Sequence, residues 1–477
     1  IELAAARVAG ASVETNAARL DDRFRLLTTG SDDLPTRQRT LRATLDWSWD
    51  LLGGRERTLL GRLSVFAGGW TLEAAEAVCA GQEGDSWAVL DGLDGLVNRS
   101  LVQLDETPEG EVRYRLLESV RRHAGEQLAA AGEEATTRDG HLSYYLALAE
   151  QAVQAFRGPE LGTWLDRLDT EHDNLRAALR WAPARARGED GLQLASALAP
   201  FWEFRGHIAE GRRRLEEMLA AFQGSPGVRA RALNAAGFLM MRAGGISASL
   251  PLYQESLALR RELNDMRGMA AALTNIGNAH IEMGEYEQAL PAYAEALEFC
   301  RASGDQSGVT AALNNQAVAM RELGEYERAE ALAKESLAMR REQGDLRGVA
   351  EATNNLAQAA FMQGRYEQAT ALFKEGLLQS RDLGDMIRLL EALEGLAWTA
   401  AALGQPRWAA RQGGAAEAER ERLGLPQGIP DRAFRDRASQ AMRAVLGEEM
   451  FAAAWAEGQA MTLNETLAPA LKADPAG

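Results

Sequence analysis

A regular sequence period runs through the second half of the chain and limits its fold more than any other feature. The segment NNLAQAAFMQGRYEQA at 354–369 matches NNQAVAMRELGEYERA at 314–329 and TNIGNAHIEMGEYEQA at 274–289. The same step separates Gly284, Gly324, Gly364 and Gly404, and it also separates Ala289, Ala329, Ala369 and Ala409. A fixed period of this length indicates stacked repeats, in which each unit buries its apolar face against the next.

Each repeat contains the pattern of two amphipathic helices. Apolar residues recur at spacings of three and four, as in Leu313, Ala317 and Met320 and again in Ala329, Leu332 and Leu337, which is helical periodicity. Gly324 lies between the two helices, where a left-handed glycine can end the first one. Ala329 is small, and we expect the two helices to cross there. The pattern predicts an α-solenoid of about five 40-residue units over residues 189–427.

These units resemble the tetratricopeptide repeat. The small residues Gly277, Ala317 and Ala357 fit its pattern, as do the Gly-x-Tyr turn and the alanine that follows it. The period exceeds the common repeat length of about 34 residues. Arginines stand where the closing proline is expected, at Arg301, Arg341 and Arg381. The long form is similar to the repeats of kinesin light chains. This resemblance implies a right-handed solenoid whose first helices line a concave groove.

Asparagine recurs on those first helices. Asn275, Asn315 and Asn355 share one helical phase, and Asn278, Asn314, Asn354 and Arg321 lie beside them. Amide side chains both donate and accept hydrogen bonds, so a row of them can clamp the backbone of an extended peptide, as the matching asparagines of kinesin-light-chain-like repeats do. Asparagine is a poor helix former, and we therefore expect a ligand-binding role for all seven residues. The alternative is that the amides only join neighbouring first helices by hydrogen bonds.

The N-terminal part of the chain, up to position 135, does not repeat. Helical patterns at 34–52, 54–70, 71–79 and 89–100 are followed by an alternating segment at 101–117, which predicts a β-hairpin with its turn at Pro108-Glu109-Gly110. A further helix is expected at 118–132. Helices followed by a hairpin and a helix describe a winged helix. The predicted organisation is a helical segment at 1–30, a winged helix at 31–135, a helical connector at 136–188, the solenoid at 189–427 and a helical cap at 428–477.

Several segments resemble STAND-class signalling ATPases, in particular those fused to bacterial regulators of the AfsR and LuxR types. The resemblance rests on IELAAAR (1–7), RFRLLTTG (23–30), LRATLDWSWDLL (41–52), LSVFAGGWTLEAAEAVC (63–79), LVNRSLV (96–102), YRLLESVRRHA (114–124), LDTEHDNLRAALRWA (168–182) and FAAAWAEGQAMTLNETLAPAL (451–471). It implies a nucleotide-binding domain ahead of the first segment, and a winged helix and repeat sensor after it.

The nucleotide chemistry of that class is not encoded in this sequence. No G-x-x-x-x-G-K-[ST] motif occurs, so no P-loop can hold phosphates here, and ATP or ADP is expected only in an upstream domain. The resemblance also implies that the end of the winged helix lies near that nucleotide. The corresponding residues are Leu117, Glu118 and, one turn later, Arg121. Leucine at 117 cannot make the contact that a histidine makes there in related switch ATPases.

Composition argues against several other functions. The formal charge of −17 opposes binding to nucleic acids and anionic membranes, and the helix ahead of the hairpin carries Asp91 and Asp94. No apolar run is long enough to cross a bilayer. Cys79 and Cys300 cannot form a disulfide framework, so a reducing, cytoplasmic location is expected. The five histidines show no metal-ligand spacing, and no catalytic constellation is evident.

The sequence therefore predicts a regulatory and sensor region that is not itself an enzyme. In this hypothesis the groove binds a peptide or protein partner, and the winged helix controls an upstream nucleotide-binding domain. A repeat scaffold that assembles proteins without switching is the alternative.

Overall fold

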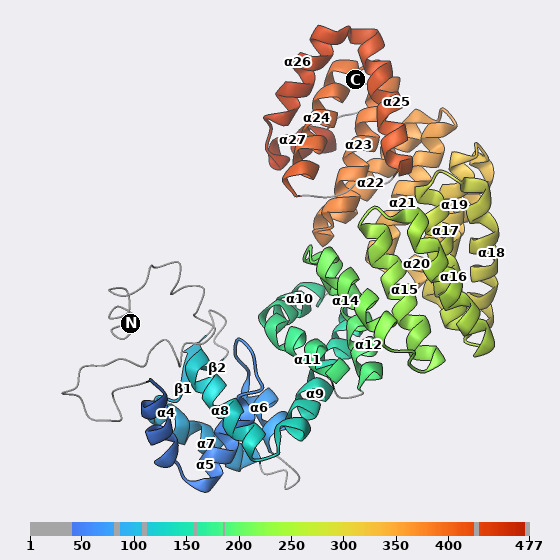
Figure 1. Cartoon of the computed structure of the whole chain (residues 1–477). Coiled ribbons are helices and arrows are strands. Elements are labelled where there is room, and N and C mark those ends of the chain that lie inside the picture. Colours follow the sequence, from blue (N-terminus) through green and yellow to red (C-terminus); the bar gives the residue numbers. More distant parts are fainter. Residues whose placement is uncertain are drawn as a thin grey trace, which may run out of the picture. The chain divides into compact units, whose positions relative to one another are not determined.

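The computed structural model describes residues 41–80, 86–106, 112–156, 160–184, 187–423 and 429–472, and its elements are labelled in Figure 1. The chain forms two compact units, Ile1–Val228 and Arg229–Gly477, and each is described by itself. The expected helical segment at 1–30, the part of the expected winged helix at 31–40 and the turn at 108–110 lie outside the described residues.

The first unit begins with the expected winged helix. Its helices are α4 (Leu41–Asp50), α5 (Gly54–Leu63), α6 (Leu72–Cys79), α7 (Ser86–Asn98) and α8 (Glu118–Ala130), and its strands are β1 (Val102–Glu106) and β2 (Val112–Leu116). The strands pair antiparallel with Val102 opposite Leu116, which confirms the predicted hairpin. Trp70 pairs with Tyr114 on the other side of β2, so the hairpin is fixed to the segment between α5 and α6. The core contains Leu63, Phe66, Trp70, Leu93 and Leu96.

Six further helices complete the first unit, and they are called the connector from here on, although the connector expected from the sequence ended at position 188. They are α9 (Glu134–Ala155), α10 (Leu161–Thr170), α11 (His172–Ala184), α12 (Gly188–Ala197), α13 (Ala199–Phe204) and α14 (Ile208–Ala221). Helix α12 packs against α9, α11 and α14. The boundary by packing therefore falls at Val228, well after the expected start of the solenoid at position 189.

A buried polar cluster joins the connector to the winged helix. Glu171 accepts hydrogen bonds from Arg113 of β2 (2.5 Å) and from the Tyr145 hydroxyl (2.8 Å). Asn174 donates to the Gly69 carbonyl and accepts from the Ala67 amide, both at 2.7 Å. Both side chains are buried, and the bonds of Asn174 satisfy backbone groups that would otherwise be unpaired away from water. The winged helix and the connector are therefore held together within this unit.

The second unit contains five helix pairs, as the sequence predicts. They are α15 (Pro226–Arg242) with α16 (Ile246–Glu262), α17 (Met266–Glu282) with α18 (Tyr286–Ala302), α19 (Gln306–Glu322) with α20 (Tyr326–Gln343), α21 (Leu346–Met362) with α22 (Tyr366–Leu383), and α23 (Met386–Ala402) with α24 (Pro406–Arg422). Successive helices pack side by side (Figure 1). The end of the stack is covered by α25 (Ile429–Leu446), α26 (Glu448–Gln459) and α27 (Leu463–Lys472), which pack on α23 and α24.

Local sequence explains where these helices start and stop. The glycines between the helices of each pair have positive φ, for example 81° at Gly324, which confirms the predicted left-handed turn. Each following pair starts with an aspartate whose carboxylate accepts from a backbone N–H three positions on, a regular N-cap. These aspartates are Asp265, Asp305, Asp345 and Asp385. Ala329 is 1% exposed, and the equivalent alanines of the neighbouring units, Ala289 and Ala369, are fully buried, as expected for a close helix crossing.

Candidate ligand-binding face of the repeats

Asparagine side chains form hydrogen bonds from three of the first helices, α17, α19 and α21, to the first helix before each of them. The Nδ2 of Asn275 in α17 donates to Oδ1 of Asn234 in α15 at 3.1 Å. Asn315 in α19 donates to Asn278 in α17 at 3.2 Å, and Asn355 in α21 donates to Asn314 in α19 at 2.8 Å. We call these three bonds the amide ladder. They join four consecutive first helices across three unit boundaries.

The acceptor of the middle rung lies one helical turn away from the acceptors of the other two. Asn234 and Asn314 are 41 residues before their donors, whereas Asn278 is 37 residues before Asn315. Position 274, which would supply the equivalent acceptor, is a threonine whose hydroxyl bonds to the Ala270 carbonyl of its own helix (2.8 Å). Asn278 is therefore the acceptor of this rung, and its Oδ1 also accepts a hydrogen bond from the Tyr293 hydroxyl at 2.8 Å.

The rungs leave hydrogen-bonding capacity unused. The donor residues Asn275, Asn315 and Asn355 are partly exposed. In each of them one N–H of the amide donates the hydrogen bond to the preceding first helix. Within the described part of the chain, the Oδ1 of each accepts no hydrogen bond. An amide has two donors and an acceptor of its own. Joining the helices and contacting a ligand are thus compatible roles for these three residues, although they were posed as alternatives from the sequence.

Two of the predicted ligand-binding residues are turned inward. Asn314 is 2% exposed and Asn354 is 1% exposed. Asn314 is the acceptor of the third rung, and the Nδ2 of Asn354 donates to the Arg388 carbonyl at 2.9 Å. The predicted direct contact with a ligand is not available to either side chain here, because neighbouring helices cover both.

The ladder also includes a residue that the sequence reasoning did not single out. Asn234 accepts the first rung. The sequence could have indicated Asn234 by its position, because it precedes Asn275 by one period and one residue, just as Asn314 precedes Asn355.

Arg321 is also an internal residue. It is 6% exposed, its Nη1 donates to Gln358 on α21, and its Nε donates to Glu322 at 2.9 Å. The predicted ligand contact is therefore replaced by a link between α19 and α21. A ligand role for the predicted set remains a prediction, and the partly exposed members that can carry it are Asn275, Asn278, Asn315 and Asn355.

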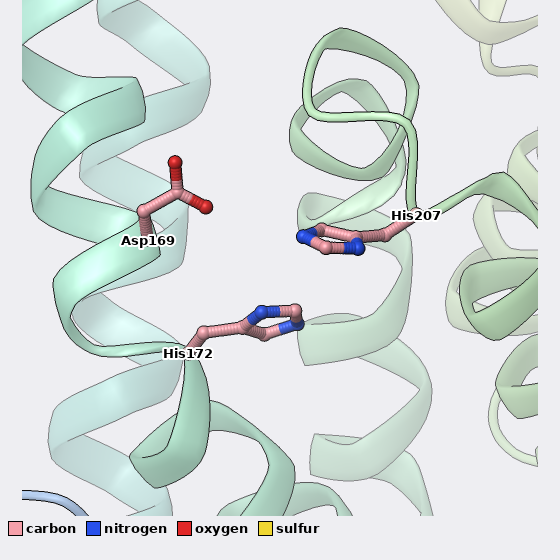
Figure 2. A group of neighbouring side chains, drawn as sticks. All are labelled: Asp169, His172 and His207. Atoms are coloured by element: carbon pink, nitrogen blue, oxygen red, sulfur yellow. The ribbon is translucent and has the colours of Figure 1, made fainter.

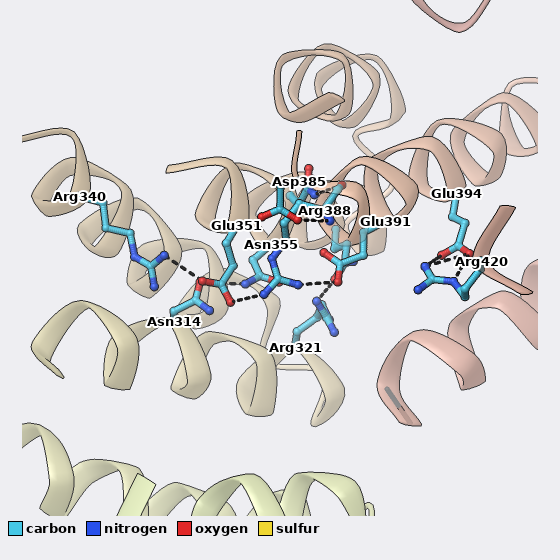
Figure 3. Close-up of polar contacts among 12 residues, drawn as sticks. Asn314, Arg321, Arg340, Glu351, Asn355, Asp385, Arg388, Glu391, Glu394 and Arg420 are labelled. Carbon is cyan, nitrogen blue, oxygen red and sulfur yellow. Dashed lines mark hydrogen bonds and ion pairs between the residues drawn. The ribbon is translucent and has the colours of Figure 1, made fainter. Parts of the chain in front are cut away.

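Charged side chains next to the ladder are paired (Figure 3). Glu351 lies between Arg340 at 2.9 Å and Arg388 at 3.0 Å. Burial opposes ionisation of Glu351, but the two guanidinium groups outweigh it and lower its pKa. Glu394 and Arg420 form a second pair at 3.2 Å, both nearly inaccessible to solvent. Because these charges compensate each other inside the stack, they fix the repeats and do not attract ligands from a distance.

The residues predicted to lie near an upstream nucleotide are at the start of α8. Leu117 is 47% exposed and precedes the helix. Glu118 accepts two hydrogen bonds from Arg121, at 2.7 and 2.8 Å. Arg121 also lines a cavity of about 280 Å³, together with Val65, Ala67, Arg138, Ala177, Arg180 and Trp181. Proximity to a nucleotide remains a prediction for Leu117, Glu118 and Arg121.

The candidate DNA-reading helix of the winged helix presents carboxylates. Asp91 and Asp94 of α7 are exposed, and Arg99, just beyond its end, pairs with Glu56 at 2.8 Å. Arg62 of α5 pairs with Glu133 at 2.8 Å. An acidic reading helix is repelled by phosphate groups.

Comparison with known proteins finds family matches for a segment of each of the two units. Residues 52–129 match the family described as "Winged helix-turn-helix domain", and residues 268–342 and 349–378 match two families described as "Tetratricopeptide repeat". The chain is 41% identical over 286 residues to "Putative HTH-type transcriptional regulator Rv0890c" of Mycobacterium tuberculosis (strain ATCC 25618 / H37Rv), a match that covers 58% of this chain and 32% of that protein. The chain thus spans about a third of the length of such curated relatives.

Two solved structures are weakly similar to the chain. One is a STAND protein with a tetratricopeptide repeat sensor from Pyrococcus horikoshii, which is 16% identical with a TM-score of 0.49 and covers 99% of this chain and 74% of that one. The other is aspartyl phosphate phosphatase F from Bacillus subtilis, which is 15% identical with a TM-score of 0.48 and covers 72% and 88%. Neither similarity is used to assign a fold or a function to this chain. Among the described residues, no helix has the length and apolar character needed to span a bilayer.

Proposed function

We propose that this chain is the regulatory and sensor region of a larger signalling regulator, and that the repeats bind an extended segment of a peptide or protein. The amide ladder carries this proposal. It leaves one amide acceptor and one amide donor partly exposed in each of three successive units. Groups of this kind, repeated once per unit, suit a ligand that presents backbone N–H and C=O groups at intervals and bind it without requiring particular side chains.

Signal transfer in this proposal is a population shift. A bound partner changes an equilibrium only if it binds one arrangement of the protein better than another. The buried cluster of Glu171 and Asn174 supports a role for the winged helix in this process, because it links the hairpin to the connector. Motion of the connector would therefore reach the end of the winged helix, where Glu118 and Arg121 lie. The controlled element is an upstream nucleotide-binding domain, and the chain itself has no catalytic role.

The two residues of the third rung supply a matched test of ligand binding. Asn355→Ala and Asn314→Ala both break the same hydrogen bond, but only Asn355 has a partly exposed amide. The probe is a peptide selected from a random library against the wild-type chain, with affinity measured by fluorescence anisotropy. We expect Asn355→Ala to weaken binding and Asn314→Ala to leave the affinity per folded molecule unchanged.

The triple variant Asn275→Ala, Asn315→Ala and Asn355→Ala tests how much the three amides together contribute to the affinity for the peptide. Each lost hydrogen bond is worth about 1 kcal/mol, so binding should weaken about 100-fold if the three contributions roughly add. Equal losses of affinity in the two single variants of the third rung would show that the ladder is structural only.

A repeat scaffold without switching remains the second candidate. The two are separated in a longer protein that carries the nucleotide-binding domain. A switch requires partner affinity to differ between its ATP and ADP forms, because coupling between two sites is reciprocal. A scaffold binds its partner equally well in both forms.

A further inference from the structure

We propose that Asp169, His172 and His207 form a binding site for a divalent transition metal ion of the zinc type. The three residues come from separate places in the connector: Asp169 from α10, His172 from the first position of α11, and His207 from the residue before α14. One potential ligand atom from each lies within 4.8 Å of the other two. Figure 2 shows the carboxylate and both imidazole rings directed toward one another.

The state of His172 indicates that something belongs there. The residue is 8% exposed, and its Nε2 is shielded from solvent without a hydrogen-bond partner. Buried polar atoms are nearly always paired, so an orphaned imidazole nitrogen needs an explanation. A neutral imidazole nitrogen has a lone pair that can bind a metal ion.

The ligand set suits zinc. Imidazole nitrogen and carboxylate oxygen are both zinc ligands at about 2.0–2.2 Å, and three protein ligands with an open fourth position are a common arrangement. Tetrahedral coordination at those bond lengths brings ligand atoms to roughly 3.3 Å from each other, so modest side-chain rotations from the present positions suffice. The two imidazole rings are 4.6 Å apart between centroids. Phe201 packs against both rings, and such an apolar wall limits access of water.

Neighbouring charges define what the ion must compete with. Arg205 Nε lies 2.7 Å from Asp169 Oδ2, and the same guanidinium also pairs with Asp166. Glu210 Oε2 is 3.8 Å from His172 Nε2, but Arg176 holds that carboxylate through two hydrogen bonds. An ion would therefore take the free oxygen of Asp169 or displace Arg205, which keeps Asp166 as a partner. Glu210 is placed to orient the ligands or to occupy the fourth position.

A bound ion would join the turn between α10 and α11 to the start of α14. No sequence motif points to this site, because the two histidines are far apart in the chain and match no short ligand pattern.

The test is titration of the chelator-treated whole chain with Zn²⁺ in a calorimeter and with Co²⁺ by visible absorption. The expected result is one high-affinity equivalent per chain and the intense Co²⁺ bands of a tetrahedral site. His172→Gln, His207→Gln and Asp169→Asn should each weaken Zn²⁺ binding by about 100-fold or more, since each removes a direct ligand. His280→Gln is the matched control, because it removes a histidine from the other unit and should leave Zn²⁺ binding unchanged.

Asp169 is exposed and His207 is partly exposed, so their variants remain informative even if His172→Gln impairs folding. Absence of a stoichiometric Zn²⁺ complex in the wild-type chain would overturn the proposal. So would unchanged affinity in the folded His207→Gln and Asp169→Asn variants.

Discussion

At the scale of single residues, the distance between the two helices of a unit depends on matched side-chain sizes. Gly277 of α17 faces the ring of Tyr293 in α18, and a Cβ added at 277 would overlap that ring. The next unit has Ala317 and Ala333 at the equivalent positions, and both are buried in one apolar cluster. In these two units a large residue faces a glycine, and two small residues face each other. The following unit has Ala357 and Phe373 at the equivalent positions, and there a Cβ added at Gly395 of α23 would overlap the Phe373 ring.

The effect of Gly277→Ala on the free energy of unfolding should change sign when Tyr293 is replaced by alanine. In the wild-type chain the new methyl meets the buried Tyr293 ring, and overpacking costs about 1–3 kcal/mol. This cost exceeds or equals the helix propensity gained, which is about 1 kcal/mol. In a Tyr293→Ala background the clash is gone, so the same substitution should stabilise the repeats by about 1 kcal/mol. Urea denaturation of the four chains of this double-mutant cycle measures the change, and additive free energies would contradict the size matching.

Single residues also mark the limit of inference from the sequence. The repeat period located the ladder and put Asn275, Asn315 and Asn355 on one helical face. It could not separate Asn315 from the adjacent Asn314, because burial of Asn314 depends on how α19 is rotated against its neighbours. Arg321 was assigned to the ligand for the same reason, although the structure bonds it to Gln358.

At the scale of elements, three arginines bridge successive second helices. Two of them, Arg301 and Arg341, replace expected closing prolines, whereas the third such arginine, Arg381, pairs with the adjacent Asp382 of its own helix. Arg261 pairs with Glu295 at 2.7 Å, Arg301 with Glu335 at 3.4 Å and Arg341 with Glu375 at 3.0 Å. In each case the partner lies on the second helix of the next unit. These exposed pairs contribute about 0–1 kcal/mol each, less than the buried apolar contacts. Their regular spacing helps to fix the register of neighbouring units.

Helix α9 should make the first unit sensitive to acid. Burial lowers the pKa of His141 from its ordinary value of 6.5 to about 4. The folded state therefore binds fewer protons than the unfolded chain between these values, so stability falls as the pH drops through 6.5 toward 4. The loss attributable to His141 between pH 7 and pH 5 should be about 2 kcal/mol.

The measurement is urea denaturation at both pH values, followed by hydrogen exchange in peptides from α9. His141→Gln should reduce the difference between the two pH values by about 2 kcal/mol, whatever its effect on stability at pH 7. The same pH dependence in His141→Gln and wild type would exclude this residue as the cause.

At the scale of the whole molecule, the features that could be predicted from the sequence are those that depend on neighbouring residues. Helix pairs, turns and the winged helix follow from periodicity and glycine placement, which are properties of neighbouring residues. The inclusion of α12 to α14 in the first unit could not be predicted in this way. It depends on contacts between α12 and α9, which lie far apart in the sequence and belong to no repeat. The contact between His172 and His207 could not be predicted from the sequence for the same reason.

The chain should neither bind ATP tightly nor hydrolyse it. Its sequence contains no G-x-x-x-x-G-K-[ST] segment, and without a P-loop no set of backbone N–H groups is arranged around the β- and γ-phosphates. Calorimetric titration with Mg-ATP should give no saturable heat, and phosphate release should equal the buffer rate. A stoichiometric complex at micromolar ATP would refute this expectation and would direct attention to the arginine-lined cavity beside Arg121.

The amide ladder also bears on how such a chain can change its length. Loss of residues 306–345 by recombination would bring Asn355 to the place of Asn315, opposite Asn278, which already accepts an amide from that direction. Loss of residues 266–305 would bring Asn315 opposite Asn234, which now accepts from Asn275. The units of α17 and α19 each contain a donor and an acceptor of the amide ladder, so either unit can be removed or duplicated without interrupting the hydrogen bonds. Recombination can therefore shorten or extend the stack of repeats by one unit at a time.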